Sequence, residues 1–143
     1  MPSGRSFPRR ALAAALLAAG ALAGCQLDPS FNAINDQVLG PRCTAPECHD
    51  SVDHKADLDL ETDPYAALVN VAAEGDLSAN PPSTPVDRIR VIPGDPDNSF
   101  LVIKLEGNQE SNEGVRMPNR GVHLRKYEID AIREWILEGA LNN

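Results

Sequence analysis

Two thiols and an imidazole stand close together in residues 41–50, PRCTAPECHD. His49 directly follows Cys48, and Cys43 lies five positions upstream of Cys48. A cysteine–histidine pair with a second cysteine shortly before it is the attachment pattern of c-type haem. In that chemistry the two thiols add across the vinyl groups of haem, and the histidine binds the iron. The segment predicts one covalent haem c, attached through Cys43 and Cys48, with His49 as an iron ligand.

The interval between the cysteines leaves other interpretations open. Four residues separate Cys43 from Cys48, whereas the usual haem pattern has two between its thiols. A disulfide between Cys43 and Cys48 would close a small loop and is chemically easy in an oxidising compartment. A thiolate copper or zinc site is less favoured, because no further Cys or His recurs at the spacing of metal ligands. Haem attachment and a disulfide remain competing predictions for these thiols.

An iron that shuttles electrons needs a second axial ligand besides His49. Beyond the N-terminal segment, which contains Met1, the only methionine is Met117. It precedes Pro118 in a polar, glycine-bearing stretch where a methionine has no obvious packing role. Met117 is the predicted sixth ligand, and His123, six residues further on, is its competitor.

Three other side chains near these positions have two interpretations. Arg116 and Arg120 flank Met117, and either could pair with a haem propionate or be an ordinary surface charge. His54 is a further competitor of Met117 as iron ligand, but it lies in an acid-rich stretch and is most simply a solvated loop residue.

The first 24 residues differ from the rest of the chain. Arg5, Arg9 and Arg10 are followed by an apolar run over residues 11–23, and no acidic residue occurs among them. A run of 13 residues is too short for a bilayer core, which needs about 20 in a helix, and the pattern is that of a secretory signal. The run ends at Leu22-Ala23-Gly24-Cys25, which resembles the lipobox of bacterial lipoproteins. An ordinary cleaved signal with a chance cysteine is the alternative.

The lipobox resemblance implies three segments and a location. Residues 1–24 are the predicted signal peptide, residues 25–30 a short tether and residues 31–143 the domain. Acylated Cys25 would anchor the protein to a membrane in the periplasm while the domain stays in water. Gln26, which is not acidic, follows the cysteine, and this favours the outer membrane. One cysteine is then used for lipid and two for haem.

Composition restricts the partners and the core. Residues 25–143 keep all 21 acidic side chains without the three N-terminal arginines, so the formal charge falls from −8 to −11. This charge excludes nucleic acid as a partner class and favours redox partners with a basic docking face. These residues include 33 large apolar side chains, of which five are aromatic, and ten prolines. So thin a core would gain from a large apolar cofactor.

The elements that must position these residues are predicted to be helices. One is expected over about 30–38, ended by Gly40-Pro41, and one from Pro64 after a cap at Thr62 or Asp63. Asp95-Pro96 is expected to start a third helix through residues 100–105, and leucines 58 and 60 to point inward from a short extended segment. The last, over about 126–138, carries an apolar stripe and ends at Gly139. The prediction is a small all-α domain with long loops.

Residues 31–140 as a whole resemble a known group, the cytochrome c-like domains of bacterial lipoproteins, including planctomycete-type and class I-like cytochromes c. The resemblance rests on Cys48-His49, Leu58-Asp59-Leu60, Val91-Ile92-Pro93-Gly94-Asp95-Pro96 with Ser99 and Leu101, Arg116-Met117-Pro118, and Trp135-Ile136-Leu137-Glu138-Gly139-Ala140. It implies a helical fold around one haem, with His49 proximal and Met117 distal. The chain departs from the group in its cysteine spacing and in having Arg125 where such helices commonly begin with serine or threonine.

The function expected from these features is one-electron transfer by a membrane-anchored periplasmic lipoprotein. No acid–base pair or nucleophile constellation stands out in the sequence, so an electron carrier is expected and not an enzyme. The alternative is a lipoprotein without haem, in which a Cys43–Cys48 disulfide stabilises a binding or accessory domain.

Overall fold

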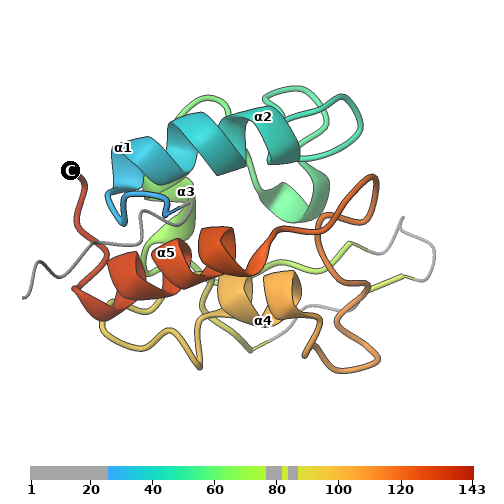
Figure 1. The fold of residues 1–143 in the computed structure, drawn as a ribbon. Coiled ribbons are helices and arrows are strands. Elements are labelled where there is room, and N and C mark those ends of the chain that lie inside the picture. The colour runs from blue at the N-terminus through green and yellow to red at the C-terminus, as the bar shows by residue number, and fades with distance from the viewer. Residues whose placement is uncertain (1–25, 77–81, 84–86) are drawn as a thin grey trace, which may run out of the picture.

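The computed structural model describes residues 26–76, 82–83 and 87–143. The predicted signal peptide and the lipid-attachment residue Cys25 lie outside them. The described part is mostly helical, which confirms the predicted class at that level (Figure 1). The helices are α1 (Phe31–Ile34), α2 (Gly40–Cys43), α3 (Pro64–Leu68), α4 (Phe100–Glu106) and α5 (Lys126–Leu137), with a π-helical segment (Asn35–Leu39) and a 3-10 turn (Lys55–Asp57).

No strand forms in this described part of the chain. Its only sheet-like pairings are single bridges between Val69 and Val91 and between Ala72 and Ile89. No described helix combines the length and apolar character needed to cross a bilayer.

The N-terminal helical run is longer than predicted. It starts after Ser30, whose hydroxyl accepts a hydrogen bond from the N–H of Ala33, and continues through the π-helical segment into α2. The expectation that Gly40-Pro41 ends the helix is wrong. Gly40 donates its N–H to the carbonyl of Asn35, five residues back, and this wider register lets the run continue across Pro41, which has no N–H to give. Cys43 is consequently the last residue of a helix.

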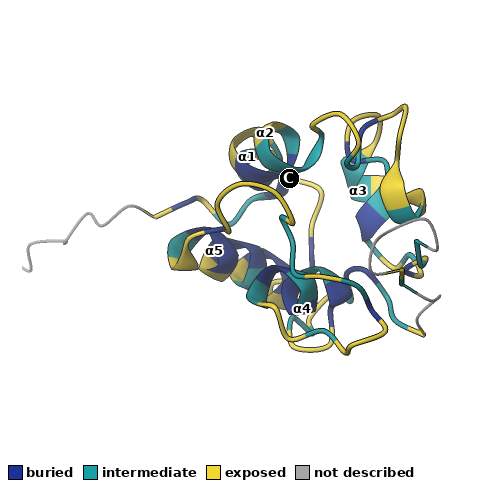
Figure 2. Ribbon diagram, turned by 90° about the vertical axis from the view of Figure 1, so that its right-hand side faces the viewer, coloured by how far each residue is buried: buried dark blue, intermediate teal, exposed yellow. Residues whose placement is uncertain are grey.

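The core lies between the N-terminal run and the C-terminal helices. In Figure 1, α5 lies between α1 and α4, and Figure 2 shows that these helices turn buried faces toward one another. The predicted stripe of α5 is confirmed, since Ile129, Ile132, Trp135 and Ile136 are all buried. Leu27 also joins this core, so packing begins inside the predicted tether.

Aromatic contacts tie α1 to two other helices. The ring of Phe31 lies 5.1 Å from that of Tyr65 on α3 and 5.4 Å from that of Trp135 on α5, measured between centroids. The C-terminal residues close the same region, because Asn143 accepts a hydrogen bond from the backbone N–H of Asn32. Three of the few aromatic side chains are thus concentrated at one end of the core.

An aspartate followed by proline was predicted to start a helix at Asp63-Pro64 and at Asp95-Pro96, and only the first pair does so. Asp63 caps α3 as predicted, accepting a hydrogen bond from the N–H of Ala66 at 3.1 Å, with Pro64 as the first helical residue. Asp95 does not start α4. Its carboxylate instead accepts from Asn98 within a turn, and the helix begins only after Ser99. The buried Ser99 hydroxyl donates to the carbonyl of Asp95 and accepts from the N–H of Ile92, so it fixes this turn against the helix start.

Candidate functional site

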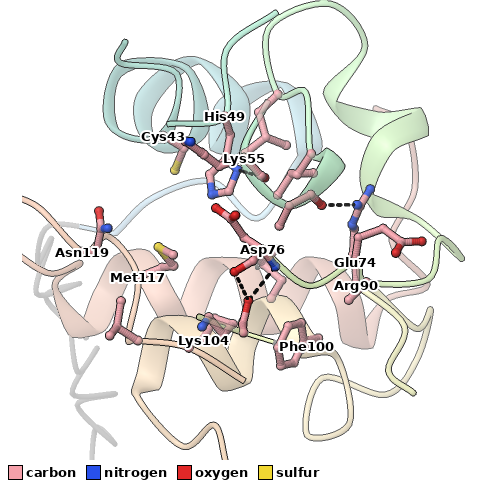
Figure 3. A pocket seen from close by; sticks show the side chains of 18 of the residues that line it. Cys43, His49, Lys55, Glu74, Asp76, Arg90, Phe100, Lys104, Met117 and Asn119 are labelled. Atoms are coloured by element: carbon pink, nitrogen blue, oxygen red, sulfur yellow. Dashed lines mark hydrogen bonds between the residues drawn. The ribbon is translucent and has the colours of Figure 1, made fainter. Parts of the chain in front are cut away.

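A cavity of about 540 Å³ lies between the cysteine segment, α4 and the loop that precedes α5 (Figure 3). This volume is in the range of small-molecule and cofactor sites. Three of the residues singled out in the sequence, Cys43, His49 and Met117, line it. Much of the remaining wall is apolar and is formed by Leu58, Leu60, Leu68, Phe100, Leu101 and Leu105. Both leucines of the predicted inward-facing segment therefore reach the cavity.

The imidazole of His49 is fixed by a backbone carbonyl. Its Nδ1 lies 3.0 Å from the carbonyl oxygen of Lys55. Because a carbonyl can only accept, Nδ1 carries the proton and Nε2 keeps its lone pair. Figure 3 shows the ring directed into the cavity. Burial lowers the pKa of His49, although the hydrogen bond to Lys55 opposes this, so the neutral form that binds metals is favoured.

Arg90 holds the turn that presents this carbonyl. Its side chain is 6 % exposed, and its guanidinium donates to the carbonyls of Ala67, Ala56 and Asp57 at 2.9, 3.1 and 2.8 Å. Ala56 and Asp57 have φ angles of 57° and 52°, a left-handed backbone conformation that residues other than glycine rarely adopt. The bonds from Arg90 keep this turn beside His49.

Met117 is held by the end of α4. Its N–H donates to the carbonyl of Lys104 at 2.9 Å, and the Nε of Arg116 donates to the carbonyl of Leu105 at 2.8 Å. These carbonyls belong to the last turn of the helix, where no intrahelical N–H is available to them. The Met117 side chain is half-buried and packs against the main core. The polar loop that carries it thus caps α4, and α4 in turn fixes the position of the methionine.

The two cysteines differ in their surroundings. Both are free thiols, and only Cys43 lines the cavity, while Cys48 is half-buried in the following turn. Burial raises the pKa of the Cys43 thiol to about 11; neighbouring Arg42 lowers it and Cys48 raises it further. Cys43 is therefore a protonated thiol at neutral pH.

The other predicted candidates lie elsewhere or are already paired. His123 and His54 are exposed, and neither lines the cavity. Arg116 is bonded to the end of α4, as described above. Arg120 does line the cavity, where its guanidinium pairs with the carboxylate of Glu47 at 2.9 Å. Of the two methionine-flanking arginines, only Arg120 faces the site.

One wall of the cavity contains an ionic cluster that the sequence did not suggest. The Glu113 carboxylate pairs with Arg88 at 2.7 Å and accepts from the N–H of Glu110 at 2.8 Å. The ammonium of Lys104 donates to the carbonyl of Glu113 at 2.7 Å and lies 5.7 Å from the centre of the Phe100 ring. Burial lowers the pKa of Lys104, although Glu113 opposes this. The cluster secures the loop between α4 and Met117.

Comparisons with known proteins assign no family to the chain. No protein-family model matches it, and neither a curated protein nor a solved structure does. The function of the cavity must consequently be argued from its own residues.

The end of α4 predicts how a glycine substitution affects the Met117 loop. Gly107 has φ of 84°, and a Cβ there would lie 2.8 Å from Cδ of Arg116. Gly94 is the comparison position, because it has a similar φ of 82° but no atom within 4 Å of a Cβ placed there. Both Gly→Ala variants should lose about 1–2 kcal/mol of unfolding free energy from the left-handed backbone. Gly107→Ala should lose about 1 kcal/mol more, because Arg116 must leave its hydrogen bond with Leu105.

Urea unfolding of the two variants measures this difference, and hydrogen exchange at the Met117 amide locates it. We expect faster exchange at that amide in Gly107→Ala than in Gly94→Ala. Equal losses and equal exchange would show that Arg116 does not connect Gly107 to the methionine.

Glu113 predicts a pH dependence of stability. Burial alone would raise the pKa of Glu113, but the hydrogen bond from Arg88 and that from the N–H of Glu110 hold it below its ordinary value. Its stabilising contribution is present above the ordinary glutamate pKa of about 4.3 and is lost as the pH falls through the lower folded value. Glu113→Gln should thus destabilise the protein at pH 7, and by progressively less as the pH falls below about 4.3.

Urea midpoints between pH 3 and 8 measure this effect. Glu134→Gln, at an exposed acid on α5, serves as the reference for removing one carboxylate from the surface. A stability gap between Glu113→Gln and the native chain that persists unchanged into acid would contradict the assignment.

Proposed function

We propose that this protein is a membrane-anchored periplasmic lipoprotein that carries one covalent haem c and transfers single electrons. The observation that supports it most is the cavity that brings Cys43, His49 and Met117 together. These residues come from a helix end, the turn after it and a loop 68 positions further along. One wall thus offers a thiol and an imidazole, and another offers a thioether.

The donor set fits a haem. The neutral His49 with its Nδ1–H on a carbonyl has the arrangement of metal-ligating histidines, whose other nitrogen is held by a backbone or carboxylate oxygen. Met117 would bind the iron together with His49, and Cys43 and Cys48 would form the thioether bonds. The group, when bound, supplies a one-electron iron couple. The leucines and Phe100 supply an apolar wall suited to a porphyrin.

The chain's own residues would set the properties of that couple. Histidine with methionine gives a higher potential than two histidines, and limited access of water raises it further. Arg90 and the Lys55 carbonyl keep the imidazole orientation, and the end of α4 keeps the methionine in place. These roles are positioning and solvent exclusion, so we propose an electron carrier and not an enzyme.

The remaining parts of the proposal concern location and partners. Cys25 would carry the lipid anchor, in the outer membrane as the favoured site. Redox partners would dock through a basic face, because residues 25–143 carry a formal charge of −11. Nucleic acid is not a proposed partner.

Haem attachment is tested on the full chain expressed in a host with c-type haem maturation. We expect a c-type pyridine haemochrome and an intact mass that contains one haem. The competing disulfide predicts a colourless protein that has lost two hydrogens at Cys43 and Cys48. Cys25→Ser is the matched control, since it should lose the lipid and retain the haem. A haem-free product from this host would refute the proposed function.

The sixth ligand is tested by Met117→Ala. The variant should lose the methionine-to-iron charge-transfer band and have a lower reduction potential, because it loses the soft thioether ligand that favours ferrous iron. The covalent haem should remain, since both cysteines are intact. His123→Ala is the control and should leave the band and the potential unchanged. The reverse pattern would assign the ligand to His123.

A further inference from the structure

The residues that directly precede Cys43 and Cys48 both contact the segment that follows Met117. Arg42 precedes Cys43, and its guanidinium donates to the carbonyls of Val122 and His123. The same group pairs with the Glu128 carboxylate at 3.1 Å. Glu47 precedes Cys48 and pairs with Arg120 at 2.9 Å. The cysteine segment is therefore tied to the Met117 side of the cavity at two points.

These contacts are the main restraint on residues 118–124. Among the described residues, this segment makes no backbone–backbone hydrogen bond to any other element. Residues 119–123 are exposed, and Leu124 returns the chain to the core. Since few other contacts hold it, the position of the segment depends strongly on Arg42 and on the Glu47–Arg120 pair.

The wide interval between the cysteines supplies the residue for the second contact. Residues 44–47 form a turn in which Cys48 donates its N–H to the carbonyl of Ala45 at 3.0 Å. Glu47 has a left-handed φ of 65°, held by a 2.7 Å bond from its N–H to the carboxylate of Asp53. Both Glu47 and Arg120 line the cavity. The turn thus places a carboxylate at the edge of the site.

We propose that Arg42 and the Glu47–Arg120 ion pair form a clamp that closes residues 118–124 over the cavity. The clamp keeps Met117 in position and limits the access of small external ligands. This inference rests on the proposed function where it concerns the iron. Arg42, Glu47 and Arg120 are positioning residues, because they act through the segment and not on the iron.

The clamp's two parts differ in expected strength. Glu47 and Arg120 are each 68 % exposed, and ion pairs of that kind shift an equilibrium by a factor of about 1.4–5. Salt screens them, so this part weakens as ionic strength rises. Arg42 faces a nearly buried carboxylate, and its loss should have the larger effect.

The first experiment measures imidazole binding to the ferric haem protein, in which imidazole competes with Met117. Glu47→Ala and Arg120→Ala should each raise the imidazole affinity about 1.4–5-fold, and the double variant no further. The exchanged pair, Glu47→Arg with Arg120→Glu, should restore much of the native value. Raising the salt should increase the affinity of the native protein and not that of the double variant. Arg42→Gln should raise the imidazole affinity by more than either Glu47→Ala or Arg120→Ala does.

Lys126→Ala is the matched control, because it removes an exposed ion pair with Asp130 that lies on α5 and does not cross the cavity. It should leave the imidazole affinity unchanged. Additive effects of Glu47→Ala and Arg120→Ala, no rescue by the exchanged pair, or an equal effect of Lys126→Ala would overturn the clamp.

A second experiment needs no haem. If the purified chain carries none, the proposed function fails, and the clamp is judged on the reduced protein by the rate at which iodoacetamide alkylates Cys43. Glu47→Ala and Arg120→Ala should alkylate faster than the native chain at an unchanged Tm, with the same rescue by the exchanged pair and the same salt dependence. Arg42→Gln is left out of this comparison, because it removes a charge that lowers the pKa of the Cys43 thiol. Alkylation rates equal to that of the native chain would refute the clamp.

In haem-loaded protein, an imidazole affinity that the clamp variants leave unchanged would refute the clamp and leave the proposed function standing.

Discussion

The site depends first on the hydrogen bonds of Arg90. Its guanidinium binds carbonyls in α3 and in the Lys55–Asp57 turn, its own N–H donates to Val71, and its carbonyl accepts from Leu101 at the start of α4. One residue thus connects three segments that surround the cavity. A buried guanidinium is stable only when its N–H groups are bonded, and irregular backbone needs partners for its carbonyls. The hydrogen bonds between the Arg90 guanidinium and these carbonyls meet both requirements at once.

The two sides of the cavity are fixed by different physical means. His49 lies in a turn without regular structure, so its orientation depends on individual bonds, above all the one to the Lys55 carbonyl. Met117 also lies in a loop, but that loop binds the free carbonyls at the end of α4. A helix end is a rigid support, since the core holds the helix and the carbonyl directions follow from its geometry. The histidine side is therefore the more sensitive to loop substitutions.

The sequence predicted the parts of the fold that local chemistry determines. The stripe of α5 and the Asp63 cap follow from periodicity and short-range hydrogen bonding, and Cys43, His49 and Met117 were singled out by residue type. Other features depend on contacts between distant residues. Arg90 alternates with apolar neighbours and gives no sign that it is buried, and nothing local pairs Glu47 with Arg120. The helix continues past Pro41 through a π-helical register, and the Asp95 turn is completed by Ser99.

The few large apolar side chains of the chain are divided between the core and the cavity wall. The aromatic contacts of Phe31 lie at one end of the molecule, while Phe100 and several leucines face the cavity. Leu60, Leu68, Phe100 and Leu105 are already buried, whereas Leu58 and Leu101 are only partly buried. The apolar surface that these two leucines still expose contributes to stability once a large apolar group covers it. A ligand that contacts this wall in the folded state alone adds its binding free energy to stability. The proposed haem would thus complete the interior and hold together the two loops that meet across it.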